Sequence, residues 1–307
     1  MFYNSFSQNL KSIFKERVHK ISIMTGLSCP NRDGTLSNKG CVFCDPYGSG
    51  FDKMNYPDDQ SIKEQIINNM DKIKKRFKCD KFIAYFQAFS NTNTSPENLK
   101  KITREALSIE NIVGISISTR PDLFSDEIIE VLSEINLQTY LWVEIGIQSA
   151  NEKTLELINR NHTFEDVIIS VSKLHEHKIK VCGHVIIGLP GESRDDILNT
   201  AKSLTKIKID GIKIHPLFIA KNSQLETEWK KSKIKLIDED IYIKLVVDFL
   251  EHSRPETSIH RIVGSGRKDV HVAPDWCLKK HRVIQKINDE FRSRNSKQGK
   301  HYCQIVD

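Results

Sequence analysis

The segment that decides how this chain is interpreted is Leu27-Ser28-Cys29-Pro30-Asn31-Arg32-Asp33-Gly34-Thr35, followed by Gly40-Cys41-Val42-Phe43-Cys44-Asp45. Its three cysteines follow the spacing C-x11-C-x2-C. A 4Fe–4S cluster has four irons, and cysteine thiolates are its usual protein ligands. Three thiolates leave one iron open, and an open iron can bind a substrate or a cofactor. The spacing therefore predicts a cluster with one open coordination position.

A zinc site is the alternative interpretation of the same cysteines. A lone C-x2-C pair in an intracellular protein is also typical of a zinc half-site or a redox pair. Zinc needs a fourth ligand, and the other cysteines are scattered singly, at Cys79, Cys182, Cys277 and Cys303. A histidine such as His19 could supply that ligand. The motifs further along the chain favour the cluster.

The composition is that of a folded, water-soluble chain. At 307 residues it can form one large domain or a domain with a short appendage. Apolar residues make up 38 % and charged residues 28 %, which excludes a disordered protein. No apolar run approaches the roughly 18 residues that span a bilayer, and no signal-peptide core is present. Seven cysteines without framework spacing indicate a reducing compartment, so we expect a cytoplasmic protein without a membrane partner.

The net charge of +6 is concentrated near the C-terminus. Residues 279–300 contain eight Lys or Arg and two Asp or Glu, and the rest of the chain is balanced. A local basic segment of this kind is a plausible site for a polyanion. The alternative is a solvated terminal helix, and charge alone leaves both open.

Apolar runs of strand length alternate with amphipathic helical stretches along most of the chain. The expected strands are residues 21–25, 82–87, 113–119, 139–145, 181–187 and 211–215. The expected helices are residues 61–77, 96–107, 126–135, 152–159, 164–177 and 195–206. Ser61 with Glu64 fits a capping box, and Ser95 precedes Pro96 as an N-cap. The alternation predicts an all-parallel sheet, either doubly wound or closed into a barrel.

Polar residues follow five of these strands, where packing alone explains them poorly. They lie at residues 85–92, at 118–122, at Glu144 and Gln148, at 188–192, and at Lys213 and His215. In parallel barrels the chemistry sits at the C-terminal ends of the strands. The pattern therefore predicts one site at that end.

Together with the cysteine segment, these motifs resemble the radical S-adenosylmethionine (SAM) superfamily. The chain is most similar to the branch related to the catalytic subunit of elongator, and within it to the YtqA/YhcC (MnmL-like) family. That family's Cys-Pro-Asn-Arg-Asp-Gly-Thr and Gly-Cys-x-Phe-Cys segments are nearly reproduced here. The resemblance implies an α/β partial (β/α)6 TIM-type barrel over residues 18–250. A short N-terminal extension (1–17) would precede it, and a closing segment with a basic helix (251–307) would follow.

The resemblance also implies cofactors and the residues that bind them. Cys29, Cys41 and Cys44 would ligate a 4Fe–4S cluster, and S-adenosyl-L-methionine would chelate the open iron. Phe43 would shield the cluster and help anchor the adenine, and Gln87 would meet the methionine amino group. The remaining implied cofactor contacts are Ser118, Arg120, Asp122, Glu144, Gln148, Ile186 and Gly188.

Chemical reasoning adds detail to three of these positions. Arg120 fits a carboxylate in bidentate fashion, and Asp122 is expected both to orient Arg120 and to cap the helix that follows. A buried Glu144 needs a partner, and Arg120 is the expected one. Glycines such as Gly188 let the backbone approach the adenine closely.

The catalytic residues are not fixed by the sequence. Lys213, His215 and His184 are candidates at the barrel mouth, where they could contact substrate or carry protons. Purely structural histidines are equally compatible with the pattern. Lys213 or Arg267 could hold a substrate carboxylate.

The resemblance points to wobble uridine of tRNA as the substrate. The implied reaction converts 5-carboxymethylaminomethyluridine into 5-aminomethyluridine, with a flavodoxin or ferredoxin-type protein as electron donor and a tRNA methyltransferase acting downstream. A radical SAM enzyme acting on a small molecule or a peptide is one alternative. A zinc-containing tRNA-binding protein without catalysis is the other.

Overall fold

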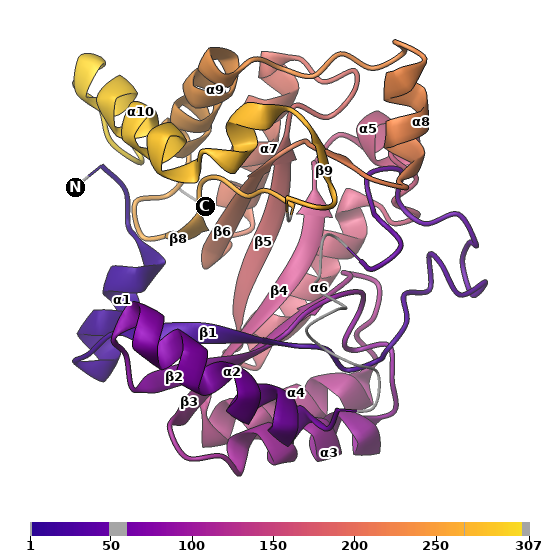
Figure 1. Ribbon diagram of the computed structural model, residues 1–307, viewed down its shortest axis with the longest axis vertical. Helices are drawn as coiled ribbons and strands as arrows, with labels where there is room; N and C mark the ends of the chain where they lie inside the picture. The colour runs from indigo at the N-terminus through magenta and orange to yellow at the C-terminus, as the bar shows by residue number, and fades with distance from the viewer. Residues whose placement is uncertain (1, 49–59, 267, 303–307) are drawn as a thin grey trace.

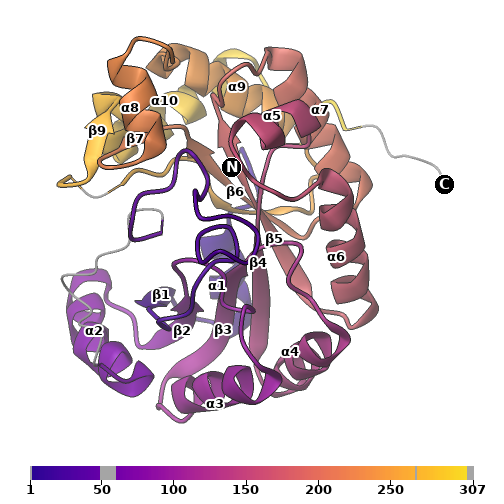
Figure 2. The same cartoon turned by 90° about the vertical axis from the view of Figure 1, so that its right-hand side faces the viewer.

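A curled sheet of parallel strands surrounded by helices dominates the computed structural model, which describes residues 2–48, 60–266 and 268–302 (Figure 1). The sheet has seven strands in the order β1-β2-β3-β4-β5-β6-β8, and every neighbouring pair is parallel. Figure 2 shows the sheet bent into a half-barrel with helices on its outer side. The strands are β1 (Val18–Ile23), β2 (Lys81–Phe86), β3 (Ile112–Thr119), β4 (Tyr140–Gln148), β5 (Lys180–Ile187), β6 (Gly211–Pro216) and β8 (Ser258–Arg261).

The helices connect successive strands, as parallel strands require. The helices before and between the strands up to β6 are α1 (Phe6–Phe14), α2 (Ile62–Phe77), α3 (Pro96–Leu107), α4 (Asp126–Gln138), α5 (Glu152–Leu157), α6 (Phe164–Glu176) and α7 (Arg194–Lys206). The elements that follow β6 are β7 (Ile219–Ala220), α8 (Gln224–Lys230), α9 (Glu239–Glu251), β9 (His271–Ala273), the 3-10 turn η2 (Asp275–Leu278) and α10 (Lys280–Ser293). Strands β7 and β9 form a separate antiparallel pair.

The predicted partial barrel is confirmed, and each expected strand and helix is present with ends shifted by at most a few residues. Local chemistry sets several helix starts. Ser61 and Glu64 form the expected capping box, and Ser95 caps α3 with Pro96 in its first turn. The strands are apolar on both faces because one face packs against helices and the other fills the barrel interior.

The sequence did not predict β8, which adds a seventh strand to the expected six. Its four residues, Ser258-Ile259-His260-Arg261, are too few and too polar to show strand periodicity. Pairing with β6 creates the strand, with Lys213 beside Arg261. The segment after residue 250 therefore contributes directly to the barrel wall.

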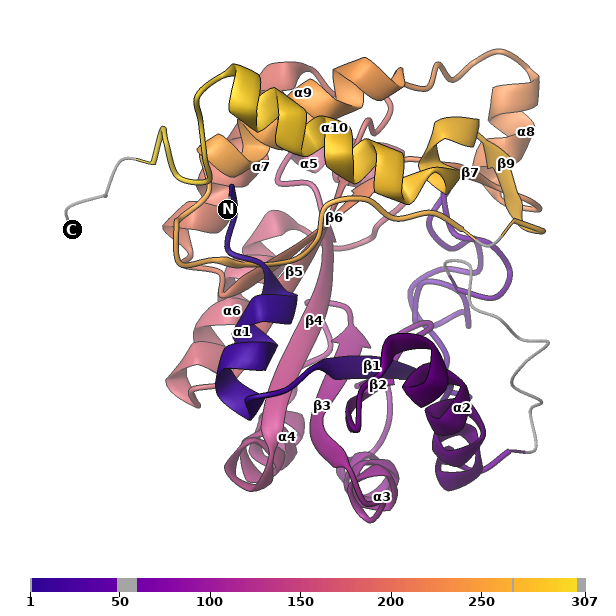
Figure 3. The ribbon, with the colours of Figure 1, turned by 60° about the vertical axis from the view of Figure 1, so that its left-hand side comes forward.

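Helix α1 covers the N-terminal ends of the strands, opposite to the predicted site. Figure 3 shows it in front of the sheet, near β1. Its Phe6 and Leu10 pack against Ile83, Trp142 and Cys182, each near the start of its strand. The helix thus closes the bottom of the half-barrel with apolar side chains.

The basic C-terminal segment is a helix packed on α9, and half of its cations are neutralised within the fold. Arg282 and Lys286 pair with Glu239, and Arg294 pairs with Asp248 and Glu251. Arg292 pairs with Asp289 on the same helix. The charge run therefore serves partly to attach α10, which weakens charge alone as an argument for a polyanion site.

Across the described residues, no helix is both long enough and apolar enough to cross a lipid bilayer.

Candidate active site

A pocket opens at the C-terminal ends of the strands. Most residues singled out in the sequence meet there, although they come from segments far apart in the chain. Those that line it are Cys29, Cys41, Phe43, Cys44, Gln87, Ser118, Arg120, Gln148, His184, Lys213 and His215. Asp122 and Glu144 lie behind this wall, each bonded to a lining residue.

The cysteine loop, residues 28–48, carries the three cysteines on a backbone held by its own hydrogen bonds. The carbonyl of Cys29 accepts from the amides of Arg32 and Asp33 at 2.8 and 3.1 Å, and the amide of Cys44 donates to the carbonyl of Cys41 at 3.0 Å. Val42 ties the loop to two helices, because its amide donates to Ile158 and its carbonyl accepts from Leu225. The loop is therefore positioned by the barrel as well as by its sequence.

The surroundings of the three cysteines bear on the two metal interpretations. In a tetrahedral zinc site with bonds of about 2.3 Å, sulfurs lie about 3.8 Å apart. Among the described residues, the only group of three possible ligands whose atoms all lie within 4.8 Å of one another is Glu144, Cys182 and His184, so the three cysteines are not gathered around a single ion. Three thiols that line one pocket fit a 4Fe–4S cluster, which Cys29, Cys41 and Cys44 would hold.

Arg160 is a pocket residue that the sequence did not single out. Its side chain is 6 % exposed, lines the pocket, and donates from Nη1 to Cys41 Sγ at 3.2 Å. Nη2 donates to the carbonyl of Gly146 at 2.6 Å, and Nε donates to Nε2 of His162 at 2.9 Å. Burial and the Arg160 charge lower the pKa of His162 to about 3, so His162 remains a neutral acceptor. Asn31 adds a second donor to Cys41, at 3.4 Å.

The prediction that Arg120 is the partner of Glu144 is wrong. The guanidinium of Arg120 forms a bidentate pair with Asp122, with both N–O distances 2.8 Å, and also donates to the carbonyls of Arg160 and Asn161. Asp122 does orient Arg120 as expected, but Ser125 caps α4 in its place. Arg120 therefore holds the backbone that presents Arg160. A buried arginine with so many local acceptors is not available to Glu144.

Glu144 is instead the centre of a buried polar group, which we call the Glu144 cluster: Lys20, Ser116, Glu144, His184 and Lys213. Both lysine ammonium groups donate to its carboxylate, one to each oxygen. Ser116 Oγ donates to Oε1 at 2.5 Å, and His184 Nε2 donates to Oε2 at 2.6 Å. Glu144 is fully buried, so these four donors replace its hydration.

Electrostatics fix the protonation states within the Glu144 cluster. Burial alone would raise the pKa of Glu144, but the charges of Lys20 and Lys213 outweigh it and hold that pKa well below its usual range. Burial and the Lys213 charge lower the pKa of His184 to about 4, so its imidazole is neutral at pH 7. The two ammonium groups and one carboxylate leave the cluster with one excess positive charge.

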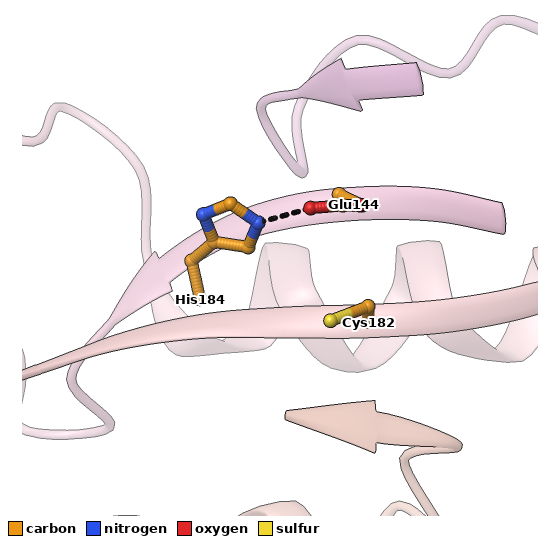
Figure 4. Close-up of side chains that lie close together, drawn as sticks. All are labelled: Glu144, Cys182 and His184. Atoms are coloured by element: carbon orange, nitrogen blue, oxygen red, sulfur yellow. Dashed lines mark hydrogen bonds and ion pairs between the residues drawn. The ribbon is translucent and has the colours of Figure 1, made fainter. Parts of the chain in front are cut away.

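Glu144, Cys182 and His184 lie close enough together to suggest a metal site (Figure 4). The surroundings argue against a cation there. His184 already uses Nε2 on Glu144, and both Glu144 oxygens accept from lysine ammonium groups. Burial raises the pKa of the Cys182 thiol, which keeps it protonated. These three side chains are therefore explained by the Glu144 cluster and the apolar layer beneath it.

Backbone strain marks the other walls of the pocket. Gln148, at a bulge that ends β4, has φ of 73°, and Ala88 and Phe89 after β2 have φ of 64° and 54°. Residues other than glycine adopt such values rarely and mostly where surrounding structure enforces them. Tyr85 lies below, and its hydroxyl accepts from Lys213 Nζ at 3.2 Å. The wall between the strands and the cysteine loop is therefore shaped by these backbone conformations.

Two predicted residues lie away from the pocket. Ile186 packs in an apolar group with Phe43 and Leu189, which supports the cysteine loop from outside. Gly188 borders a separate depression with Pro190 and Ile237. His215 does line the pocket, and its Nε2 is buried without a hydrogen-bond partner among the described residues. Burial and nearby cations lower the pKa of His215 well below its usual range. Arg267 lies outside the described residues.

Comparisons with known proteins agree with this geometry. Residues 34–204 match the family model described as Radical SAM superfamily, and residues 209–293 match the Radical_SAM C-terminal domain. The chain belongs to the radical SAM superfamily.

Within that superfamily it belongs to the elongator-like branch that includes YtqA and YhcC. It is 40 % identical to YtqA of Bacillus subtilis (strain 168), over 99 % of this chain and 94 % of that protein. It is 33 % identical to YhcC of Escherichia coli (strain K12), over 96 % and 94 %. It is also 28 % identical to the tRNA uridine(34) acetyltransferase of Methanocaldococcus jannaschii, but that match covers only 50 % of this chain and 28 % of that protein. A solved structure of Methanocaldococcus infernus Elp3 shares the fold, with a TM-score of 0.68 and 17 % identity over 92 % of this chain and 64 % of that one.

Proposed function

We propose that this protein binds a 4Fe–4S cluster through Cys29, Cys41 and Cys44 and cleaves S-adenosylmethionine to modify wobble uridine in tRNA. The proposed reaction converts 5-carboxymethylaminomethyluridine into 5-aminomethyluridine. The observation that carries the proposal is the pocket itself. Three cysteines and the cationic side chains of Lys213, Arg160 and Arg261 line one cavity, which has no acidic lining residue among those described.

The cluster and S-adenosylmethionine, when bound, supply a 5′-deoxyadenosyl radical that removes hydrogen from a C–H bond. The protein must orient the reactants and exclude water. Gln87 and Gln148 present amide side chains for polar groups of the cofactor, and Phe43 covers the loop beside Cys44. Arg160 combines a cationic side chain in the pocket with a bond to Cys41, which suits a carboxylate bound next to the cluster.

Two observations support a tRNA substrate with a carboxylate on its modified base. One relative in the same branch is named a tRNA uridine(34) acetyltransferase, and the match between the two covers half of this chain and 28 % of that protein. The excess positive charge of the Glu144 cluster favours an anionic group above it. The glycyl methylene of 5-carboxymethylaminomethyluridine would lose a hydrogen atom to the deoxyadenosyl radical, and the resulting carbon radical would give up one electron to become an iminium, with S-adenosylmethionine as the net oxidant. Addition of water to the iminium would release the two-carbon unit as glyoxylate and leave the amine. A tRNA methyltransferase could then act on that amine.

An anaerobic incubation tests the proposal. Reconstituted protein is mixed with S-adenosylmethionine, a strong reductant in place of the flavodoxin or ferredoxin-type donor, and tRNA bearing 5-carboxymethylaminomethyluridine. Mass spectrometry should detect 5-aminomethyluridine and 5′-deoxyadenosine rising together. Deoxyadenosine without any change in the tRNA would reject this substrate and leave a small molecule or peptide. Absence of both products from protein with a confirmed cluster would reject the enzymatic proposal.

A further inference from the structure

The cationic side chains that line the pocket differ in one respect, which is whether the fold already uses them. Arg32 donates to the carbonyl of Asp45, Arg120 pairs with Asp122, and Arg160 bonds to Cys41 and Gly146. Lys213 pairs with Glu144. Among the described residues, the side chain of Arg261 has no hydrogen-bond or ion-pair partner, yet it lines the same pocket. An unpaired guanidinium at a pocket wall is available to a ligand.

Strand register places Arg261 at the end of a basic row. His184 of β5 lies beside Lys213 of β6, and Lys213 lies beside Arg261 of β8. Within this row His184 is neutral because its pKa is about 4, and Lys213 is bonded to Glu144. The one cationic side chain of the row that is not bonded to a carboxylate is therefore Arg261.

The backbone next to Arg261 passes close to His215. A Cβ atom on Gly264 would lie 2.7 Å from His215 Nδ1 and 3.4 Å from Arg261 Nη1, so a larger residue at position 264 would push against both side chains. Glycine there keeps the Arg261 guanidinium and the His215 ring side by side at the pocket. A carboxylate is planar and accepts two parallel N–H bonds from a guanidinium, which makes it the group that Arg261 suits best.

We propose that Arg261 binds the carboxylate of the substrate's carboxymethylamino group and so selects substrate over product. This inference rests on the proposed function. The substrate offers Arg261 an anion, whereas the product has lost the carboxylate and keeps only its amine, which as an ammonium group Arg261 repels. The same residue would therefore hold the substrate during hydrogen abstraction and favour release of the product afterwards.

The test compares the wild type with Arg261→Met, Arg261→Lys and the control Arg104→Met. Arg104 is an exposed arginine on α3, outside the pocket. With substrate tRNA, Arg261→Met should raise KM at least about tenfold, the loss expected for a charge-assisted bidentate contact. Arg261→Lys should recover part of that loss, and Arg104→Met should match the wild type. Iron content and thermal midpoint of each variant show that the fold and the cluster persist.

A binding measurement separates failure of this inference from failure of the proposed function. Affinities of the cluster-loaded protein for tRNA bearing 5-carboxymethylaminomethyluridine and tRNA bearing 5-aminomethyluridine are measured without reductant. The wild type should prefer the carboxylate form at least about tenfold, and Arg261→Met should lose that preference. A wild type that is inactive but retains an Arg261-dependent preference would reject the reaction and keep the carboxylate contact. No preference in the wild type, or an equal one in Arg261→Met, would overturn the inference.

Discussion

The cysteine loop and the Glu144 cluster border the same pocket, but they differ in how their residues are distributed along the sequence. The cysteine loop is one continuous segment, residues 28–48, whose backbone bonds mostly to itself. The Glu144 cluster takes one residue from each of five strands, β1, β3, β4, β5 and β6. Its members farthest apart in the sequence, Lys20 and Lys213, belong to β1 and β6, and most of the barrel's sequence lies between them. One half of the site is therefore local and the other exists only in the folded sheet.

This difference separates the work of the two regions. The cysteine loop offers sulfurs whose use depends on an added cofactor, so its residues should matter little to the stability of the chain alone. The Glu144 cluster neutralises charges that are buried whether or not a ligand is bound. Its residues should therefore matter to folding as well as to binding. Variants in each region can test that division.

The largest expected effect is the loss of the cluster in Cys41→Ala. Two remaining thiolates cannot hold three irons, so the brown colour, the iron content and all cleavage of S-adenosylmethionine should disappear. The urea midpoint of the cluster-free protein should stay close to that of cluster-free wild type. Cys79→Ala, a buried cysteine at the far end of the sheet, is the matched control and should retain iron. Retention of a full cluster by Cys41→Ala would break the assignment of the loop.

Glu144→Gln should produce the opposite result, a loss of stability. The substitution leaves two lysine ammonium groups facing a neutral amide in a buried site, which costs roughly 3–5 kcal/mol of unfolding free energy. Glu134→Gln, which breaks the surface pair with Lys100, is the control and should cost less than about 1 kcal/mol. Urea unfolding measures both. Equal small losses would show that the Glu144 cluster contributes no more than a surface pair.

The smallest expected effect is the pH dependence that His184 gives to the free energy of unfolding. Its folded pKa of about 4 lies below the ordinary value of 6.5, so the folded state disfavours the charged imidazole. This contribution is present above pH 6.5 and is lost as pH falls toward 4, by roughly 1–3 kcal/mol. His184→Gln should flatten the stability profile in that window, as measured by urea midpoints. An unchanged profile would place the titration elsewhere.

The fold was largely predictable from the sequence because the barrel strands are apolar runs between well-capped helices. Residues 96–107 show this well, since Ser95, Pro96 and the 3.6-residue pattern fix the start and the extent of α3. Strand β8 and helix α1 were not predictable in this way. Both depend on partners distant in sequence, β8 on β6 and α1 on the layer around Trp142.

The candidate site likewise contains residues that local sequence could place and residues that only the folded sheet brings together. The cysteines, Gln87, Ser118 and Gln148 could be placed because each belongs to a short motif or a strand end. The partner of Glu144 could not, since strand order and register decide that Lys20 and Lys213 reach it before Arg120 does. Arg160 follows a helix and not a strand, so a search of strand ends passes over it. The signal that could have found it was the short polar run Asn159-Arg160-Asn161-His162 directly after α5.

The junction between the two ends of the chain has a consequence for the order of folding. The side-chain oxygen of Gln298 accepts a hydrogen bond from the backbone amide of Asn4 at 2.8 Å. The backbone amide of Gln298 donates to the carbonyl of Phe2, also at 2.8 Å. These contacts span almost the entire chain, and contacts of such long range form slowly because the loop they close is large. On the ribosome they must wait until residue 298 has emerged. Until then α1 is held against Trp142 and its apolar neighbours by its own packing, without the anchor that residue 298 gives to the segment before the helix.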